Sequence, residues 1–157
     1  MEIDTSAICN SMKKKIIIVS VLCVVISACF LLFRKTEVIF LQHVEGVTDI
    51  VVKKFPITKI GKISWWKDNK FVLKDKYGMP KRDKNGVYFI AIWDGSEGFK
   101  KIAESDNPYW YSSSGNDLFC FDEIKSENRC VEHIILMKII SIKEGEVDYI
   151  IDGDYIK

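Results

Sequence analysis

Residues 16–33 read IIIVSVLCVVISACFLLF, a run of 18 residues without a charge, a proline or a glycine. As a helix this run would be roughly 27 Å long, close to the roughly 30 Å of a bilayer's hydrocarbon core. A helix in a protein core usually keeps a polar face over five turns, and this run has none. Three lysines at 13–15 precede it, and Arg34 and Lys35 follow it, which favours a cytoplasmic N-terminus. The run therefore predicts a single-pass anchor in a bacterial inner membrane, which contacts the lipid bilayer from Ile16 to Phe33.

The anchor prediction divides the chain into a short cytoplasmic tail at 1–15, a transmembrane helix or signal anchor at 16–33, and a periplasmic domain at 36–157. Two details stay open. Met12 opens the string MKKKIII, which is a more natural start than Met1. The order Ile26-Ser27-Ala28-Cys29 is also typical of a lipoprotein cleavage site, with Cys29 as the lipidated residue. An apolar stretch continues after that cysteine, which favours the uncleaved anchor.

Two of the five cysteines, Cys120 and Cys130, lie in the predicted periplasmic domain. In an oxidising compartment this pair predicts a disulfide worth on the order of 2–3 kcal/mol. The alternatives are two free thiols or half of a zinc site. The two histidines, His43 and His133, do not supply the spacing of a zinc site.

The periplasmic domain begins with a predicted hairpin. Residues 37–44 and 47–55 are rich in β-branched and aromatic side chains, and Glu45-Gly46 supplies a short turn between them. A helix follows, with Thr58 as its N-cap and an end at about Lys76, before Gly78-Met79-Pro80. Its inward side is predicted from the apolar residues Ile60, Ile63, Trp66, Leu73 and Tyr77, with lysines on the other side.

Residues 86–93 (GVYFIAIW) predict the central strand, and Asp94-Gly95-Ser96 turns the chain. Residues 104–117 read as a long loop, a kind of segment that is often functional. A strand at 118–121, an apolar run at 133–142 and a closing strand at 147–151 complete the domain. The predicted fold class is α+β, with an N-terminal transmembrane helix and a mainly antiparallel sheet that carries one main helix.

Charge is segregated along the chain. Residues 53–84 hold 11 basic and 3 acidic residues, whereas residues 94–157 hold 7 basic and 14 acidic ones. These faces either neutralise each other across the fold or leave a basic helix that meets an anionic lipid or protein surface. No nucleic-acid-binding motif is present, and none is expected in an exported domain.

Few residues point to catalysis. The serines at 112–114 lack a nucleophile-elbow context, and no phosphate-binding loop, dinucleotide fingerprint or metalloprotease motif occurs. His43, Asp94 and His133 are the candidates for acid–base chemistry, but a turn equally explains Asp94. We therefore predict no enzyme and no cofactor.

Two aromatic clusters are the candidate interaction residues: Trp65-Trp66 on the basic helix and Tyr109-Trp110-Tyr111 in the long loop. Exposed Trp and Tyr are favoured anchors at protein and membrane interfaces. Adjacent tryptophans cannot share one helical stripe, so Trp65 should lie off the face that Trp66 buries. The alternative is a wide core that takes both.

Several short strings are specific when taken together: VKKFPIT (52–58), GKISWW (61–66), Lys76-Tyr77 with Pro80, Trp93-Asp94, and Cys120-Phe121-Asp122 with Cys130-Val131-Glu132. In these strings the chain resembles the enterobacterial putative membrane proteins of unknown function. The resemblance implies the single anchor and the paired cysteines, and it implies no catalytic residue. Residues 1–11 and 104–115 fall outside it.

These observations favour a membrane-anchored periplasmic binding protein of the cell envelope, and an immunity-type protein that neutralises a toxin is one form of it. One alternative is an envelope enzyme acting on lipid or peptidoglycan. Another is an accessory subunit of a larger inner-membrane complex. The sequence does not define the protein partner or the oligomeric state.

Overall fold

The computed structural model describes residues 5–32, 35–44, 46–101, 118–143 and 146–157. The chain divides into two compact units, Met1–Arg34 and Lys35–Lys157. Each unit is described by itself below.

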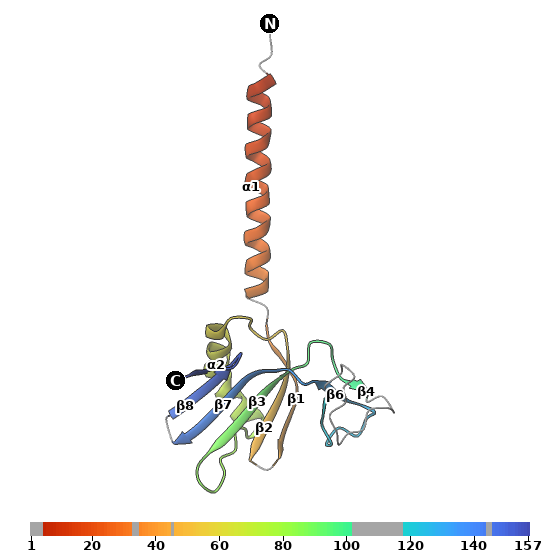
Figure 1. Cartoon of the computed structure of the whole chain (residues 1–157), viewed down its shortest axis with the longest axis vertical. Helices are drawn as coiled ribbons and strands as arrows, with labels where there is room; N and C mark the ends of the chain where they lie inside the picture. The colour runs from red at the N-terminus through yellow and green to blue at the C-terminus, as the bar shows by residue number, and fades with distance from the viewer. Residues whose placement is uncertain (1–4, 33–34, 45, 102–117, 144–145) are drawn as a thin grey trace. The chain divides into compact units, whose positions relative to one another are not determined.

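The first unit is a helix, α1 (Thr5–Leu32), of 28 residues (Figure 1). It starts earlier than the apolar run, so residues 5–15, predicted as a tail, are also helical. The apolar side chains from Ile16 to Ile26 are 52–68% exposed on all sides of the helix. In the part of the chain that the structure describes, no helix has the length and apolarity needed to cross a membrane. The spanning helix at 16–33 therefore stays a prediction, and its last residue, Phe33, lies outside the described residues.

The second unit contains a six-stranded sheet, a three-stranded sheet and one long helix, α2 (Lys59–Tyr77). The larger sheet has the strand order β1-β2-β3-β7-β8-β9, and the smaller has the order β4-β6-β5. The strands of the larger sheet are β1 (Glu37–Val44), β2 (Val47–Lys53), β3 (Tyr88–Asp94), β7 (Ile135–Lys143), β8 (Glu146–Ile151) and β9 (Asp154–Ile156). Those of the smaller sheet are β4 (Lys100–Lys101), β5 (Leu118–Cys120) and β6 (Asn128–Glu132). The predicted α+β class with a mainly antiparallel sheet is confirmed.

Local signals place the first hairpin and the closing hairpin where they were predicted. β1 and β2 pair antiparallel from Glu37↔Lys53 to Val44↔Val47, with Gly46 at φ +86° in the turn. β7 and β8 form the second hairpin. The long connection through α2 returns the chain so that β3 pairs with β2 in parallel, which is the one parallel pair in the described sheets. β3 is thereby an inner strand, as predicted.

Helix α2 begins and ends at the expected caps. The Thr58 hydroxyl accepts a hydrogen bond from the Gly61 backbone N–H at 3.1 Å. Gly78 takes a left-handed conformation at φ +67°, and its N–H donates to the Lys74 carbonyl. A Cβ on Gly78 would be strained at this φ, which explains the glycine.

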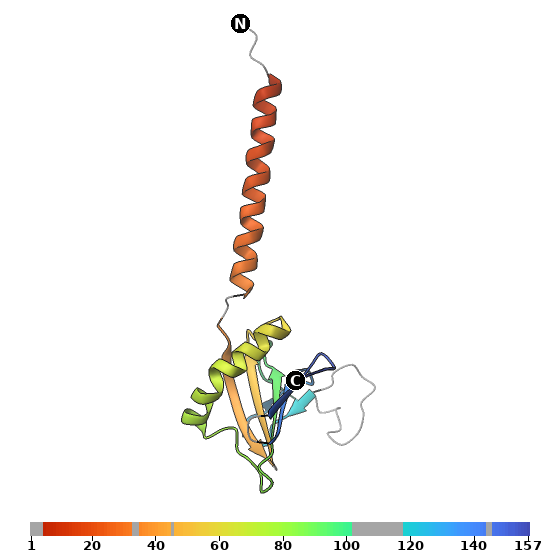
Figure 2. The same cartoon turned by 90° about the vertical axis from the view of Figure 1, so that its left-hand side faces the viewer.

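The larger sheet is covered on both faces (Figure 2). On one face, Trp66 and Leu73 of α2 pack against Ile50, Ile90 and Ile139. On the opposite face, Val51 and Trp93 meet Phe121 and Val131 from the region of the smaller sheet. The second unit therefore has two apolar layers, one on each side of the sheet.

Gly95 shows how tightly the turn after β3 approaches its neighbours. A Cβ placed there would lie 2.6 Å from Cγ1 of Val51 and 2.7 Å from Cδ1 of Ile39. The turn at Asp94-Gly95-Ser96 was predicted from turn preference alone. The structure adds a packing reason for the glycine.

Tyr88 gives the domain a pH dependence on the alkaline side. Burial raises the pKa of Tyr88 above its ordinary value of 10.0, and burial together with Tyr88 raises that of Tyr149. In the unfolded chain these phenols ionise near their ordinary pKa. Their contribution to the free energy of unfolding is therefore fully present below about pH 10 and is lost as the pH rises through the raised folded pKa. Urea unfolding between pH 8 and about pH 11 tests this. We expect the free energy of unfolding to fall less for Tyr88→Phe than for the natural protein over this range. Tyr77→Phe, on the exposed end of α2, is the matched control, and an equal change in both variants would contradict the assignment.

Candidate interaction surface

A disulfide joins Cys120 on β5 to Cys130 on β6, as predicted. The two residues are direct cross-strand partners, with Cα atoms 3.9 Å apart. Cys130 is fully buried and its strand neighbour Val131 belongs to the second apolar layer. The bond therefore fixes the smaller sheet, which covers that layer.

Removal of the disulfide has a predictable effect on stability. We expect the double variant Cys120→Ser, Cys130→Ser to lower the free energy of unfolding of the second unit by about 2–3 kcal/mol, because the loop that the bond closes is short. Urea unfolding of the full chain in detergent, followed by tryptophan fluorescence, measures the change. The control is Cys23→Ser, since Cys23 is an exposed free thiol on α1. Equal stability of the double variant and this control would contradict a stabilising role for the bond.

Trp93 lies at the centre of an aromatic cluster between the two sheets. Its ring stacks on Phe119 at a centroid distance of 4.2 Å, and the exposed ring of His133 lies 5.3 Å away. Phe121 meets Trp93 edge-on at 6.5 Å. His133 thus packs at the rim of this cluster.

Beneath the cluster, Asp49 is a buried carboxylate. It accepts hydrogen bonds from Trp93 Nε1 at 2.8 Å and from Gln42 Nε2 at 3.1 Å. Gln42 is also buried, and its Oε1 has no hydrogen-bond partner among the described residues. The sequence analysis did not single out Asp49. The available signal was a charged residue in the middle of a β-branched strand, VTDIVVK.

The structure does not bring together the three candidates for acid–base chemistry. His43 Nδ1 lies 3.0 Å from the Thr48 hydroxyl, and Thr48 aligns with Ile90 on the α2 side of the sheet. His133 lies by Trp93 on the opposite side. The Asp94 carboxylate accepts a hydrogen bond from the Ser96 backbone N–H at 2.9 Å, so it stabilises the turn after β3. Within the described ranges, no three His, Cys, Asp or Glu side chains are grouped to hold a metal ion.

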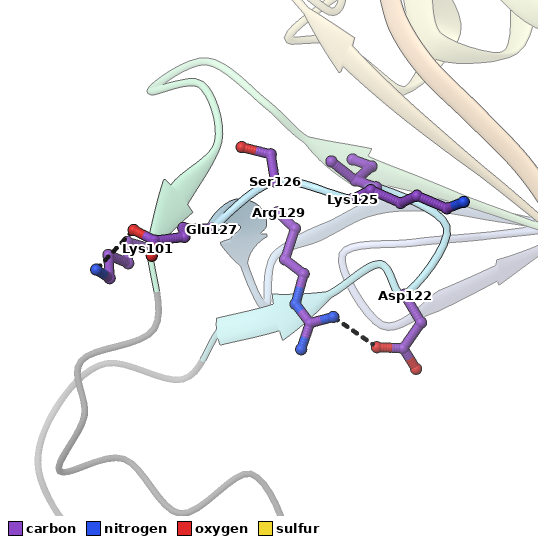
Figure 3. Close-up of a pocket in the computed structure, with 7 residues that line it drawn as sticks. Lys101, Asp122, Lys125, Ser126, Glu127 and Arg129 are labelled. Carbon is purple, nitrogen blue, oxygen red and sulfur yellow. Dashed lines mark ion pairs between the residues drawn. The ribbon is translucent and has the colours of Figure 1, made fainter.

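A shallow depression lies at the edge of the smaller sheet (Figure 3). Most of its lining is charged, and the charges pair with each other: Lys101 with Glu127 at 2.7 Å, and Arg129 with Asp122 at 3.2 Å. Ile124, Lys125 and Ser126 complete the lining. Two of the three basic side chains are paired with the two acidic ones, and the small net charge of +1 does not define a ligand.

The structure buries Trp66 fully and packs Trp65 against the edge of the same core, so it lies nearer to the alternative of a wide core that takes both rings. Trp66 is 1% exposed and lies in the core, so it is not a surface anchor. Trp65 is partly buried and meets Phe55 edge-on at 5.1 Å. Of these two side chains, Trp65 is the one that remains partly exposed to solvent. Tyr109, Trp110 and Tyr111 lie outside the described residues, and so does the side chain of Cys29.

The outer face of α2 exposes large apolar side chains beside its lysines. Phe71 and Val72 are 65% and 58% exposed. The Lys70 ammonium lies 5.0 Å from the Phe71 ring centre, and Lys67 and Lys74 are exposed one turn away on either side. Lys67 and Lys74 form no ion pair with any described residue. The predicted basic face is therefore present and carries an apolar centre.

Part of the predicted charge segregation is neutralised inside the domain. Lys59 pairs with Asp154, and the buried Lys62 donates to the Leu136 carbonyl at 3.1 Å and lies 3.4 Å from Asp152. The expectation that all helix lysines face outward is thus wrong for Lys62, which reaches across to the sheet. Residues 67–76 of α2 hold four lysines and two aspartates, so this part of the helix keeps a net charge of +2.

Comparison with known proteins gives a family. The model of the enterobacterial putative membrane protein family (DUF943), whose function is unknown, matches residues 11–156. No curated protein and no solved structure matches the chain significantly. Because the family model covers nearly the whole chain, the protein belongs to the enterobacterial putative membrane proteins.

Proposed function

We propose that this protein is held in the bacterial inner membrane by residues 16–33 and that its second unit acts in the periplasm by binding a protein partner. The anchor rests on the uncharged apolar run and on the exposure of its side chains around α1. Such a surface is unfavourable in water and favourable in lipid. The three lysines before the run favour a cytoplasmic N-terminus.

The disulfide supports the periplasmic side. Disulfides persist in oxidising compartments and are rare in the cytosol. Both cysteines of this bond lie after the apolar run, so one crossing with the N-terminus inside brings them to the oxidising side. The lysine flank and the disulfide thus favour the same orientation.

The exposed Phe71 and Val72 among the lysines of α2 carry the binding proposal. Protein interfaces usually have an apolar core and a polar rim, and aromatic residues near the centre of the core often contribute most of the affinity. Lysines outnumber the nearby Asp68 and Asp75 by two to one, which favours a partner with acidic residues around an apolar contact. An immunity-type protein that blocks a periplasmic toxin is one partner relation that fits this surface.

Site-specific photo-crosslinking in living cells tests the proposal. A photoreactive amino acid replaces Phe71 in one strain and Asp122, whose side chain is 92% exposed, in the control strain. We expect an adduct from position 71 that disappears when Lys70 and Lys74 are changed to Glu. No adduct from position 71, or the same adduct from both positions, would contradict binding through α2.

The immunity form has its own test. Cells that co-express the protein with candidate periplasmic toxins should survive, and Phe71→Asp should abolish the protection. Absence of protection and of a stable complex with these toxins would remove the immunity form, while the crosslinking result would still decide whether α2 binds a partner.

A further inference from the structure

The start of α2 exposes a second apolar site, which is separate from Phe71. Ile57 and Ile60 are 62% and 82% exposed and flank the N-cap Thr58, so the prediction that Ile60 faces inward is wrong. A Cβ on Gly61 would lie 2.9 Å from the Thr58 hydroxyl and 3.0 Å from Pro56 Cβ, so the chain is folded tightly here. This tight turn holds both isoleucines at the N-terminal end of the helix.

The local structure does not use Ile57 in the way that helix starts often do. A residue just before the N-cap commonly packs on the fourth residue of the helix. That residue here is Lys62, whose side chain is buried toward the Leu136 carbonyl and Asp152. Ile57 and Ile60 are therefore left with large exposed surfaces.

These isoleucines lie at the end of the domain where the chain enters it. Glu37, the first residue of β1, pairs with Lys53 across the sheet, and its carboxylate lies 2.7 Å from the Lys54 ammonium. The Thr36 hydroxyl donates to the Lys54 carbonyl at 3.2 Å. Residues 55–60 follow directly, so the entry point and the isoleucines belong to one end of the second unit.

Chain length limits how far this end can be from a membrane that holds residues 16–33. Four residue steps separate Phe33 from Glu37, and a fully extended chain spans at most about 14 Å over that length. A tether this short keeps the effective concentration of membrane surface high, so a small apolar contact is enough to dock.

We infer that Ile57 and Ile60 insert into the headgroup layer of the membrane that holds the anchor. Isoleucine side chains are favourable at the boundary of headgroups and acyl chains. Lys35 at the chain entry is exposed, and Lys59 directly precedes Ile60, so their long side chains can meet lipid phosphates, although Lys59 also pairs with Asp154. The inference rests on the proposed anchor. It fixes one end of the domain at the lipid surface and leaves Phe71, three turns further along α2, for the protein partner.

Lipid quenching on the full chain tests this docking. Cys9, Cys23 and Cys29 are changed to Ser, and a polarity-sensitive fluorophore is attached at Ile60→Cys or, as the matched control, at Phe71→Cys. The protein is reconstituted in nanodiscs of phosphatidylethanolamine and phosphatidylglycerol that contain a lipid quencher at the upper acyl chain. We expect severalfold stronger quenching at position 60 than at position 71, and a fall toward the control level when Ile57 is changed to Asp.

The outcomes separate the docking from the anchor. Weak quenching at position 60 in protein that remains in the nanodisc overturns the docking and leaves the anchor intact. Equal strong quenching at both positions also overturns it, because the whole helix would then lie on the lipid. Protein that does not enter the nanodisc at all overturns the anchor, and the docking with it.

Discussion

Trp66→Ala is expected to lower the free energy of unfolding of the second unit by about 3–5 kcal/mol, the usual range for removing a large aromatic side chain from a core. Among the described residues, Trp66 is the largest fully buried side chain, and it lies where α2 meets the sheet. Its loss leaves a cavity between two elements that cannot collapse freely. Urea unfolding of the full chain in detergent, monitored by far-ultraviolet circular dichroism, measures the change.

Two variants of the same helix are controls for this prediction. Trp65→Ala removes a partly buried ring at the edge of the core, so its effect should be clearly smaller. Lys67→Ala removes an exposed side chain and should stay within about 0.5 kcal/mol of the natural protein. Equal effects of Trp65→Ala and Trp66→Ala would contradict the packing of α2 described here.

Asp49→Ala is expected to lower the free energy of unfolding by roughly 2–4 kcal/mol. The substitution removes two hydrogen bonds to a charged acceptor and leaves the buried donors Trp93 Nε1 and Gln42 Nε2 without it, and each such loss is worth about 1–3 kcal/mol. Urea unfolding measures the change, and tryptophan fluorescence of the folded state should report the altered surroundings of Trp93.

The control for Asp49 is Asp122→Ala, which removes an exposed carboxylate that pairs with Arg129 at the surface. Its effect should be at most about 1 kcal/mol, as for other exposed ion pairs. If Asp49→Ala were as mild as this control, the hydrogen bonds from Trp93 and Gln42 would have no stabilising role.

The elements that local chemistry specifies were predicted from the sequence. Thr58 and Gly78 set the two ends of α2, and Gly46 sets the turn of the first hairpin. Each of these signals acts over a few residues, so a single sequence carries it. The disulfide could also be predicted from the sequence, because the predicted exported part has two cysteines.

Elements that depend on distant pairing were not predicted. The parallel pairing of β2 with β3 joins segments that α2 separates, and hydrophobic pattern alone does not define which strands are neighbours. β4 and β9 have two and three residues, too few for a periodic signal. β6 owes its place to its pairing with β5 and β4, again a distant relation.

The candidate site was predicted only in part, for a similar reason. The sequence indicated that Trp65 and Trp66 point in different directions from one helix. How deeply the sheet buries each of them depends on how α2 packs against the sheet. Phe71 was not among the candidate interaction residues of the sequence analysis. The structure instead places it among lysines on the outer face, where it becomes the centre of the proposed partner surface.

The most direct test of the account is an intact mass of the protein purified from cell membranes after free thiols are blocked, with and without reduction. The account predicts an uncleaved chain in which Cys120 and Cys130 become blockable only after reduction, as expected of an anchored protein with an oxidised periplasmic domain. A mass that corresponds to a chain beginning at a lipidated Cys29 would show that a lipid, and not a spanning helix, anchors the protein. Blocking of both Cys120 and Cys130 without reduction would contradict the oxidised periplasmic domain on which the proposed function depends.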